Sequence, residues 1–579
     1  MIIEFFKNKY HLLIILLGII FFLPFLGGIH LFDWDEINFA ESSREMLLTG
    51  DYFKVQINFE PFQEKPPFFF WLQALSMSIF GVNEFAARFP NAIIGIITLL
   101  LIFRIGTRLK NENFGIIWAL IYIASLLPHL YYKSGIIDPV FNLFIFLGIV
   151  FLIKTHNCNI NKLRTKSIIL SGVFIGLAII TKGPVGLLLL LLTFLIYWIS
   201  IKFKKIISIK EIILFGITAF LITVLWFGYE LTQNGPWFII EFIEYQLELF
   251  SQPVAGHKQP IYYHFVVILL GCFPMSIIAI PRLFRSNKSD SIDFEKWMRI
   301  LFWTVLILFT IVSTKIVHYS SMCYLPLSFL ASLELYERRE QILNKSLINN
   351  LVLSFGILFS FILTLLPIIA FNKETLLLPY IKNQASILAL KTEVIWHGTE
   401  FLIGVFFAFC VVLLYYHLKQ NRIIKALISI VIGTGITLQL YSVFVVPKIE
   451  QYSQGAAIEF YESVANKDKY ICTLGFKSYA QYFYGKTKIL DSSSALFKEK
   501  HRILETMNAR SYNDLNRKEK NNFDSFVVNF LAKGEIDKTA YFVSKINKDN
   551  YLKNKEQIKF LYTKGGFTFY KRESKQKKQ

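Results

Sequence analysis

Residues 167–201 read SIILSGVFIGLAIITKGPVGLLLLLLTFLIYWISI, two apolar runs joined by the polar tetrapeptide TKGP at 181–184. A helix needs about 20 apolar residues to cross about 30 Å of hydrocarbon, and in lipid the backbone polar groups must be satisfied internally. The runs at 167–181 and 184–201 therefore predict a pair of membrane-spanning helices, with TKGP as the turn between them.

The same pattern recurs along most of the chain and predicts thirteen spans. Of the 579 residues, 54% are apolar and 18% charged, whereas soluble domains are about 45–50% apolar and about 25% charged. This balance excludes a single soluble domain, a disordered chain and a coiled coil, and five cysteines without ligand spacing exclude a disulfide scaffold or zinc ribbon. The further runs lie at about 11–30, 87–109, 113–132, 138–154, 211–231, 262–283, 297–314, 320–335, 346–371, 398–417 and 424–446.

The formal net charge of +20 is explained by the distribution of basic residues on one side of a membrane rather than by nucleic-acid binding. With the N-terminus in the cytoplasm and thirteen spans, every dense cluster of Lys and Arg falls in a cytoplasmic loop, as the positive-inside rule requires. If a further apolar segment at 67–82 also crossed the membrane, the later basic clusters would lie outside the cell. We therefore expect this segment to lie along the membrane surface. The first run is interpreted as an uncleaved anchor, and the C-terminal tail is predicted to lie outside.

The composition changes after Pro447. Residues 1–446 are predicted to form the transmembrane domain, and the polar, Lys-rich residues 447–579 a small soluble α/β domain. Three outer loops, 31–86, 232–261 and 373–397, carry the polar residues where chemistry is expected.

Two outer acidic motifs are candidates for catalysis. In DWDEINFAESSREMLLTGDY (33–52), Asp35 and Glu36 stand at the start of a predicted short helix, where the helix dipole favours carboxylates. In GIIDPVF (135–141), Asp138 precedes Pro139. The alternative is that these acids only cap helices. An ionised carboxylate on the outer face is also suited to accept a proton.

Four lysines lie near span ends on the outer side, which the positive-inside rule disfavours. A single such lysine is usually a snorkelling anchor. Four of them together, with histidines and a tyrosine nearby, suggest an anion at the outer interface, with a lipid phosphate as the candidate. The residues are Lys65, Lys182, Lys258 and Lys315, with His257, His318 and Tyr319.

Two residues are candidate ligands for a divalent metal ion, if one is present. Glu64 and His257 are the two groups that we nominate, although two ligands are too few to close a zinc site.

The order of these motifs resembles that of the polyprenyl-phosphate-sugar glycosyltransferases of the GT-C fold. An acidic DE pair follows the first span, and AES-RE, EKPP, D-P, TKGP, GHKQPIYYH and K-x-x-HY come after it. Within that fold the chain looks most like the bacterial aminoarabinose transferases that modify lipid A, which are relatives of the protein O-mannosyltransferases. The similarity covers about residues 10–330.

This resemblance implies the fold, the donor and the roles of single residues. It implies a GT-C bundle of about thirteen helices with juxtamembrane helices in the first outer loop, and a sugar donor linked to undecaprenyl phosphate. One departure is Asn38, which stands where the family pattern has an arginine, so the sugar and the acceptor stay open. The implied catalytic residues are Asp35 and Asp138, the substrate-binding residues are Glu36, Glu41, Lys65, Lys182, Lys315, His318 and Tyr319, and the metal ligands are Glu64 and His257.

The expected activity is sugar transfer at the outer, periplasmic face of a bacterial inner membrane, with lipid A as one acceptor. The expected cofactor is at most a divalent metal (Zn²⁺, Mg²⁺ or Mn²⁺), and no Gly-rich nucleotide loop is present. The alternatives are a protein O-glycosyltransferase and, from another class, a lipid-linked sugar transporter or flippase. Transporters usually show internal repeats and mid-membrane charges, whereas in this sequence no repeat is visible and the span interiors are nearly free of charge.

Overall fold

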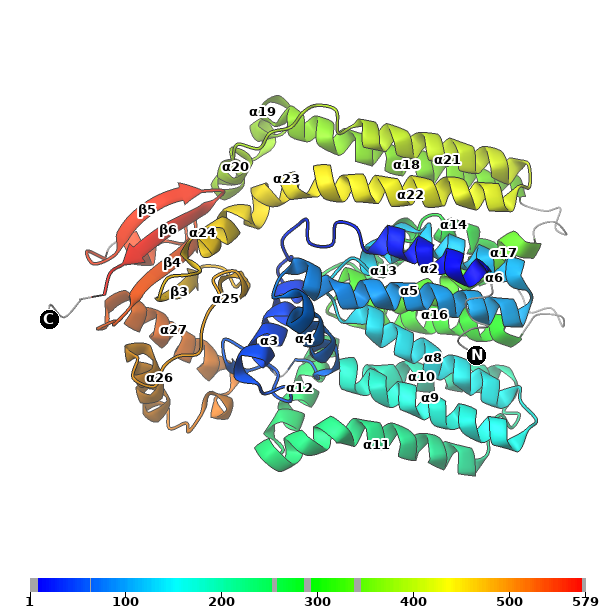
Figure 1. Ribbon diagram of the computed structural model, residues 1–579, viewed down its shortest axis with the longest axis horizontal. Coiled ribbons are helices and arrows are strands. Elements are labelled where there is room, and N and C mark those ends of the chain that lie inside the picture. Colours follow the sequence, from blue (N-terminus) through cyan, green and yellow to red (C-terminus); the bar gives the residue numbers. More distant parts are fainter. Residues whose placement is uncertain are drawn as a thin grey trace.

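The computed structural model describes residues 9–62, 64–252, 258–285, 293–337, 345–553 and 555–574. It consists of a bundle of roughly aligned helices, with a small domain containing a β-sheet at one end (Figure 1). The bundle helices are α2 (Lys9–Phe22), α5 (Glu84–Leu109), α6 (Glu112–Ile123), α8 (Asp138–His156), α9 (Asn161–Lys182), α10 (Val185–Ser200), α11 (Ile209–Asn234), α13 (Tyr263–Gly271), α16 (Asp293–Ile311), α17 (Tyr324–Glu337), α18 (Lys345–Phe371), α21 (Leu402–Lys419) and α22 (Ile423–Phe444).

Each of the thirteen predicted runs coincides with helical structure. Three runs are broken into shorter pieces, which add α7 (Leu126–Tyr131), α14 (Met275–Ile278), α15 (Ile280–Phe284) and the 3₁₀ segment η2 (Val317–Cys323). Within the described residues, seven helices are long and apolar enough to cross a membrane, and four shorter helices are apolar.

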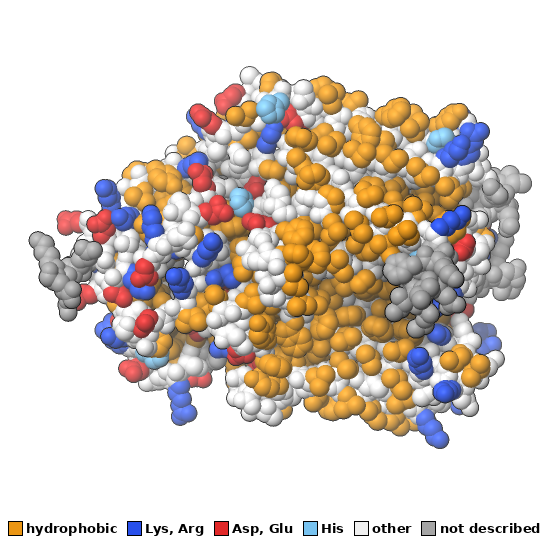
Figure 2. Space-filling view, viewed as in Figure 1, with side chains coloured by type: hydrophobic (Ala, Val, Ile, Leu, Met, Phe, Trp, Pro, Cys, Tyr) orange, Lys and Arg blue, Asp and Glu red, His pale blue; other side chains and the backbone are white. Residues whose placement is uncertain are grey.

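The surface of the bundle is suited to lipid. Apolar side chains form a broad band around the visible face of the bundle, and Lys and Arg gather at the end far from the sheet domain (Figure 2). On α11, Leu225 is 68% and Phe220 64% exposed, which is unfavourable in water and favourable in hydrocarbon. The protein is therefore a multi-pass membrane protein.

The first outer loop folds into two helices and a small hairpin. Helix α3 (Asp35–Thr49) ends at Gly50, whose φ of 72° forms the left-handed cap. The strands β1 (Gln56–Ile57) and β2 (Glu60–Pro61) pair antiparallel. Helix α4 (Phe68–Phe80) buries Phe69 and Phe70 against α3, and Figure 1 shows both helices at the end of the bundle that faces the sheet domain.

The remaining outer segments lie at the same end. The second outer loop contains α12 (Trp237–Ser251), and the third contains α19 (Lys373–Leu376), η4 (Leu378–Tyr380) and α20 (Gln384–Leu390). From α22 the chain continues through α23 (Val446–Glu450) and the π-helical turn η5 (Gln451–Gly455) into the C-terminal domain.

The C-terminal domain is a four-stranded sheet covered on both faces. Its strands β3 (Lys469–Leu474), β4 (Thr539–Lys545), β5 (Lys559–Lys564) and β6 (Phe567–Arg572) lie in the order β3-β4-β6-β5, and only β3 and β4 are parallel. Alternate residues of β4 face opposite cores, since Tyr541 and Val543 pack with α24 (Ala456–Val464) and α25 (Ala480–Phe483). Ala540 and Phe542 pack on the other side, where α26 (Ala495–Thr506), α27 (Arg517–Lys533) and α28 (Asn550–Lys553) lie.

The C-terminal domain is docked directly on the first outer loop. Leu31, Ile37 and Ala40 share one apolar core with residues of α24 and α25. The hydroxyl of Tyr484 accepts a hydrogen bond from the backbone N–H of Leu31 at 2.7 Å. The segment that carries Asp35 is therefore held between the bundle and the C-terminal domain.

Candidate functional site

Two acidic residues from distant segments meet at the end of the bundle that faces the C-terminal domain. His318, in η2, lies between them: its Nε2 is 3.1 Å from Asp35 Oδ2 and 3.7 Å from Asp138 Oδ2. Neither acid is a helix cap, because the N-cap positions of α3 and α8 are Trp34 and Ile137 and lack side-chain cap hydrogen bonds. The capping alternative therefore does not describe these carboxylates.

Lys182 joins this cluster at the end of α9. Its Nζ is 2.5 Å from Asp138 Oδ1 and lies 5.0 Å from the centre of the Tyr319 ring. The next residue, Gly183, has a φ of +102°, and a Cβ there would lie 2.6 Å from Phe242 of α12. Only glycine allows the TKGP turn to pass this close to α12 and present Lys182 to Asp138.

Lys65 approaches from the first outer loop. Its ammonium group donates to the backbone carbonyl of Glu64 at 3.1 Å and lies 5.3 Å from the centre of the Tyr245 ring. The hydroxyl of Tyr245 donates to Glu64 Oε2 at 3.0 Å. Burial lowers the pKa of Lys65, and the charges that act on it are those of Glu64, Lys182, Asp35 and Asp138, so Lys65 lies near the cluster.

The electrostatics keep the cluster charged. Burial raises the pKa of Asp35, but the hydrogen bond and charge of His318, with the charges of Lys65 and Lys182, bring it below its ordinary value. Burial also lowers the pKa of Lys65, with a further decrease from the neighbouring Lys182. Two cations thus stand close together where an added anion would stabilise both.

Two predicted substrate-binding acids have other partners. Glu36 forms an ion pair with Arg88 at 2.8 Å and accepts the backbone N–H groups of Phe32 and Gly135. Glu41 is fully buried and paired with Arg44 at 2.6 Å. Both carboxylates therefore help to fix the fold of the first outer loop, and their predicted contact with substrate stays a prediction.

The other two predicted outer lysines make different contacts. Lys315 is buried and donates to the backbone carbonyl of Val312 at 2.7 Å, and among the described residues no acid lies within ion-pair distance of it. Lys258 has an exposed side chain, and its backbone bridges to Thr314. Of the four predicted outer lysines, Lys182 pairs with an acid of the cluster and Lys65 is affected by the same charges, and the substrate-binding role of Lys315 stays a prediction.

Only one of the two predicted metal ligands lies within the described residues. His257 lies outside the described residues. In the described part of the chain, no group of three or more His, Cys, Asp or Glu side chains is arranged to hold a metal ion. Because the carboxylate of Glu64 already accepts the Tyr245 hydroxyl, the described residues do not complete a metal site, and we derive no chemical step through one.

Two residues at the site were not identified from the sequence. Arg88 stands in the predicted apolar run 87–109, and a charge in such a run indicates a buried partner, which is Glu36. Tyr245 lies in α12, where nothing in the local pattern distinguishes it from the neighbouring aromatic residues.

Comparison with known proteins agrees with this architecture. Residues 64–227 match the family model of the dolichyl-phosphate-mannose-protein mannosyltransferases. Two curated relatives are undecaprenyl phosphate-alpha-4-amino-4-deoxy-L-arabinose arabinosyl transferases. The one from Pectobacterium carotovorum is 28% identical over 56% of this chain and 58% of its own length. The one from Wigglesworthia glossinidia brevipalpis is 26% identical over 61% of this chain and 64% of its own length.

The similarity in fold extends over nearly the whole chain. The crystal structure of ArnT from Cupriavidus metallidurans bound to undecaprenyl phosphate aligns with a TM-score of 0.72 and 16% identity, covering 97% of this chain and 98% of ArnT. Its apo structure aligns with a TM-score of 0.73. The protein therefore has the GT-C fold of membrane glycosyltransferases. The expected resemblance to the aminoarabinose transferases within that fold is confirmed, although the sequence matches span only about three fifths of the relatives.

Proposed function

We propose that the protein transfers a sugar from a polyprenyl phosphate, undecaprenyl phosphate by resemblance, to an acceptor at the outer face of the membrane. The observation that carries this proposal is the cluster of Asp35, Asp138, Lys65 and Lys182 at the outer end of the bundle. The positive charge of its lysines supports binding of an anionic lipid headgroup, and the ionised acids support a contact with the acceptor.

The chemistry is a displacement at the anomeric carbon of the donor sugar. Asp35 orients the acceptor nucleophile or takes its proton, and a bond forms from the acceptor to the anomeric carbon as the bond to the lipid phosphate breaks. Negative charge then develops on the leaving phosphate. Lys65, Lys182 and the Tyr319 hydroxyl stabilise that charge, which fixed groups in a dry site do more effectively than water.

The topology supports an active site on the outer side. The basic loops lie at the end of the bundle opposite to the C-terminal domain (Figures 1 and 2), and basic loops are cytoplasmic. In a bacterial inner membrane, the cluster and the C-terminal domain then face the periplasm.

The experiment is a donor-binding and transfer assay with the full-length protein in nanodiscs. Wild type should bind undecaprenyl phosphate and use its sugar conjugate, and Lys65→Ala and Lys182→Ala should each weaken binding. The two losses should not add, because both residues serve one anion. Lys382→Ala, at an exposed lysine of the third outer loop, is the matched control. Undiminished lipid binding in both cluster variants would contradict the proposal.

The acceptor and the metal are further points for experiment. Lipid A and a protein are the two acceptor classes, and mass spectrometry of both in a deletion strain would show which one loses a sugar. A divalent metal held by Glu64 and His257 stays a prediction. Elemental analysis of the purified protein and of Glu64→Gln would test it.

A further inference from the structure

A large cavity separates the C-terminal domain from the membrane-side cluster. It has a volume of about 1420 Å³ and lies between the first outer loop, α12 and the C-terminal domain. Pockets for drug-sized ligands measure about 300–1,000 Å³, so this cavity holds more than one small group. Trp34 and Glu64 line it, and they are the chain neighbours of Asp35 and Lys65. The candidate active site therefore lies directly beside one wall of the cavity.

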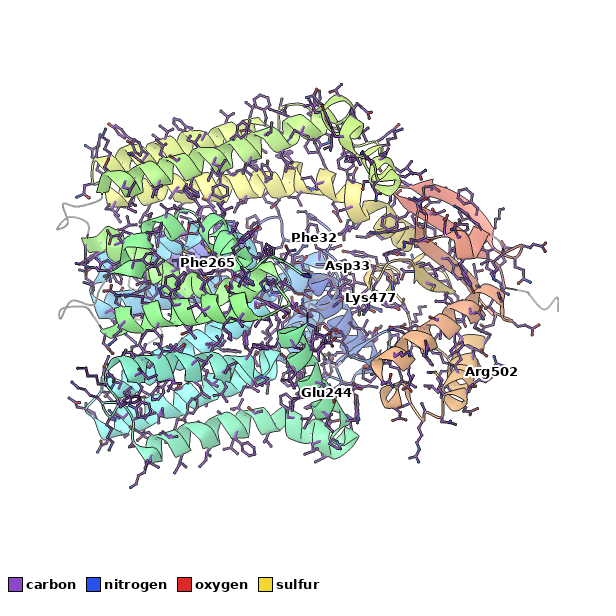
Figure 3. The ribbon with its side chains drawn as sticks, turned by 180° about the vertical axis from the view of Figure 1, so that it is seen from behind. Phe32, Asp33, Glu244, Phe265, Lys477 and Arg502 are labelled. Carbon is purple, nitrogen blue, oxygen red and sulfur yellow. The ribbon has the colours of Figure 1, made fainter. Side chains whose placement is uncertain are left out.

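The C-terminal domain supplies the opposite wall. Lys477 lies 5.0 Å from the centre of the Trp34 ring, and Tyr479 meets the same ring edge-on with the centroids 5.3 Å apart. Figure 3 shows Asp33 of the first outer loop and Lys477 of the C-terminal domain together at this junction. A ligand in the cavity would thus touch both domains.

Flat aromatic rings cover much of the cavity. Such rings offer large contact area with a negative face, which suits the weakly positive C–H groups of a saccharide ring. The aromatic lining residues include Trp34, Tyr245, Tyr479, Tyr482 and Tyr512.

The charges that line the cavity nearly cancel. Eight lysines and seven acidic residues line it, and three pairs of them are joined directly. Lys500 binds Glu60 at 3.0 Å, Lys520 binds Glu241 at 3.3 Å and Lys538 binds Asp468 at 2.8 Å. A strongly anionic ligand would meet nearly as many acids as lysines here, so the cavity favours an uncharged ligand.

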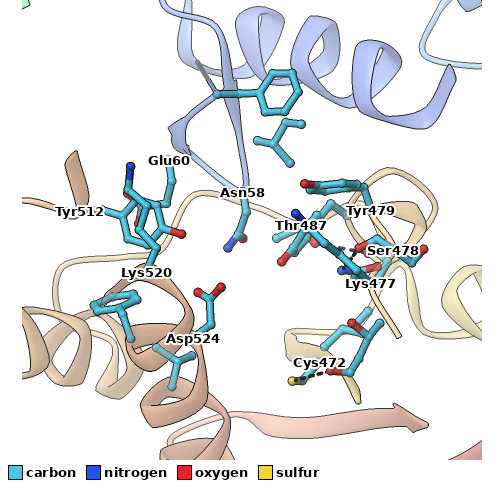
Figure 4. Close-up of a pocket in the computed structure, with 18 of the residues that line it drawn as sticks. Asn58, Glu60, Cys472, Lys477, Ser478, Tyr479, Thr487, Tyr512, Lys520 and Asp524 are labelled. Atoms are coloured by element: carbon cyan, nitrogen blue, oxygen red, sulfur yellow. Dashed lines mark hydrogen bonds between the residues drawn. The ribbon is translucent and has the colours of Figure 1, made fainter. Parts of the chain in front are cut away.

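Two polar side chains point into the cavity without a side-chain partner. In Figure 4 the carboxylate of Asp524 and the amide of Asn58 face one another across open space. Within the described residues, Asp524 has no hydrogen bond or ion pair, and burial raises its pKa to about 6. The backbone N–H of Asn58 is fixed by Glu45 at 2.6 Å. These two groups provide hydrogen-bond acceptors and donors on the lining of the cavity.

We propose that this cavity binds an uncharged saccharide unit of the acceptor, with Asp524 and Asn58 hydrogen-bonded to its hydroxyl groups and Tyr512 stacked on a ring. This inference rests on the proposed function and specifies the acceptor, which bears neutral sugar rather than being a bare polypeptide. It also gives the C-terminal domain a part in acceptor selection.

The test is saturation-transfer NMR on the full-length protein in nanodiscs, with free N,N′-diacetylchitobiose and maltotriose as probes. At least one neutral sugar should bind, and Asp524→Asn and Tyr512→Ala should each weaken it about tenfold or more, because a carboxylate and a stacking surface are lost. Glu535→Gln is the matched control, since Glu535 is an exposed acid of the same domain outside the cavity.

The results that would overturn this inference differ from the result that would overturn the proposed function. Equal sugar binding by wild type and Asp524→Asn, binding of a sugar phosphate or a peptide in place of both neutral sugars, or no binding at all would each overturn the inference. Undecaprenyl phosphate binding is measured in the same nanodiscs. Its absence from wild type would overturn the proposed function, whereas its presence without sugar binding would overturn only this inference.

Discussion

At the scale of single residues, the same carboxylate is either a helix cap or a reactive group, and its partners decide which. Asp35 begins α3 but makes no capping hydrogen bond. Its partner is His318, and its side chain is 29% exposed at the outer end of the bundle. A partly exposed acid that is fixed by a distant histidine is suited to contact substrate.

Replacement of Asp35 should therefore impair chemistry more than folding. We expect Asp35→Asn to lower the transfer rate about 10²–10⁴-fold, the range for a lost general base. A lost cap would cost about 0.5–2 kcal/mol of stability, and Asp35 does not cap. The measurements are transfer rate and thermal unfolding in detergent. A near-normal rate from a well-folded variant would show that Asp35 is not the base.

His318 should set the acidic limit of activity. In the wild type, Asp35 has a lowered pKa, so its carboxylate stays ionised until the pH falls below its ordinary titration range. His318→Ala removes the hydrogen bond and the charge that, with Lys65 and Lys182, oppose the effect of burial, so the pKa of Asp35 should rise and activity should be lost at a higher pH. The measurement is transfer rate against pH. An acidic limb at the same pH in both proteins would argue against this role.

At the scale of elements, the tetrapeptide TKGP shows how a turn places a charge. The sequence predicts a turn between two spans. The structure shows why the turn needs glycine, since Gly183 closely approaches Phe242. The breaks in the runs at 113–132 and 262–283 have a sequence signal in Pro128 and Pro274, since proline disfavours the helix interior. Local chemistry thus indicates where elements end, but not what the ends contact.

Gly183→Ala should move Lys182 away from Asp138. A Cβ at a φ of +102° and 2.6 Å from Phe242 should cost about 1–3 kcal/mol of stability and weaken binding of undecaprenyl phosphate. Gly216→Ala is the matched control, because nothing lies within 4 Å of its Cβ. The measurements are thermal unfolding and lipid binding of both variants. Equal lipid binding by Gly183→Ala and wild type would mean that this turn does not position the donor site.

At the scale of the whole molecule, the sequence could predict the spans and the residue types of the site but not its full assembly. Apolar runs and basic loops are local signals, and they indicated the helical bundle. The Arg88–Glu36 ion pair and the docking of Tyr484 on Leu31 join segments far apart in the chain, so no local pattern contains them. The cavity depends on such contacts between domains and was not predicted.

The orientation of the molecule in the membrane is the last prediction. Helix α4 and the C-terminal domain lie at one end of the bundle, and the loop with Cys158, between α8 and α9, lies at the other (Figure 1). Val82, after α4, is 45% exposed, and Glu535 of the C-terminal domain is also exposed. In spheroplasts, a membrane-impermeant maleimide should therefore label both Val82→Cys and Glu535→Cys.

Native Cys158 provides the internal control for this experiment. It is partly accessible, whereas Cys272, Cys323 and Cys410 are buried, and it should react only after the membrane is opened. Cys472 of the C-terminal domain is also partly accessible, so every protein in this experiment carries Cys472→Ala. The two introduced sites must give the same result, because α4 and the C-terminal domain share one end of a single packed structure. Labelling of Cys158 in closed spheroplasts, or of only one introduced site, would contradict the thirteen-span topology. It would also remove the outer-face location on which the proposed use of a lipid-linked donor depends.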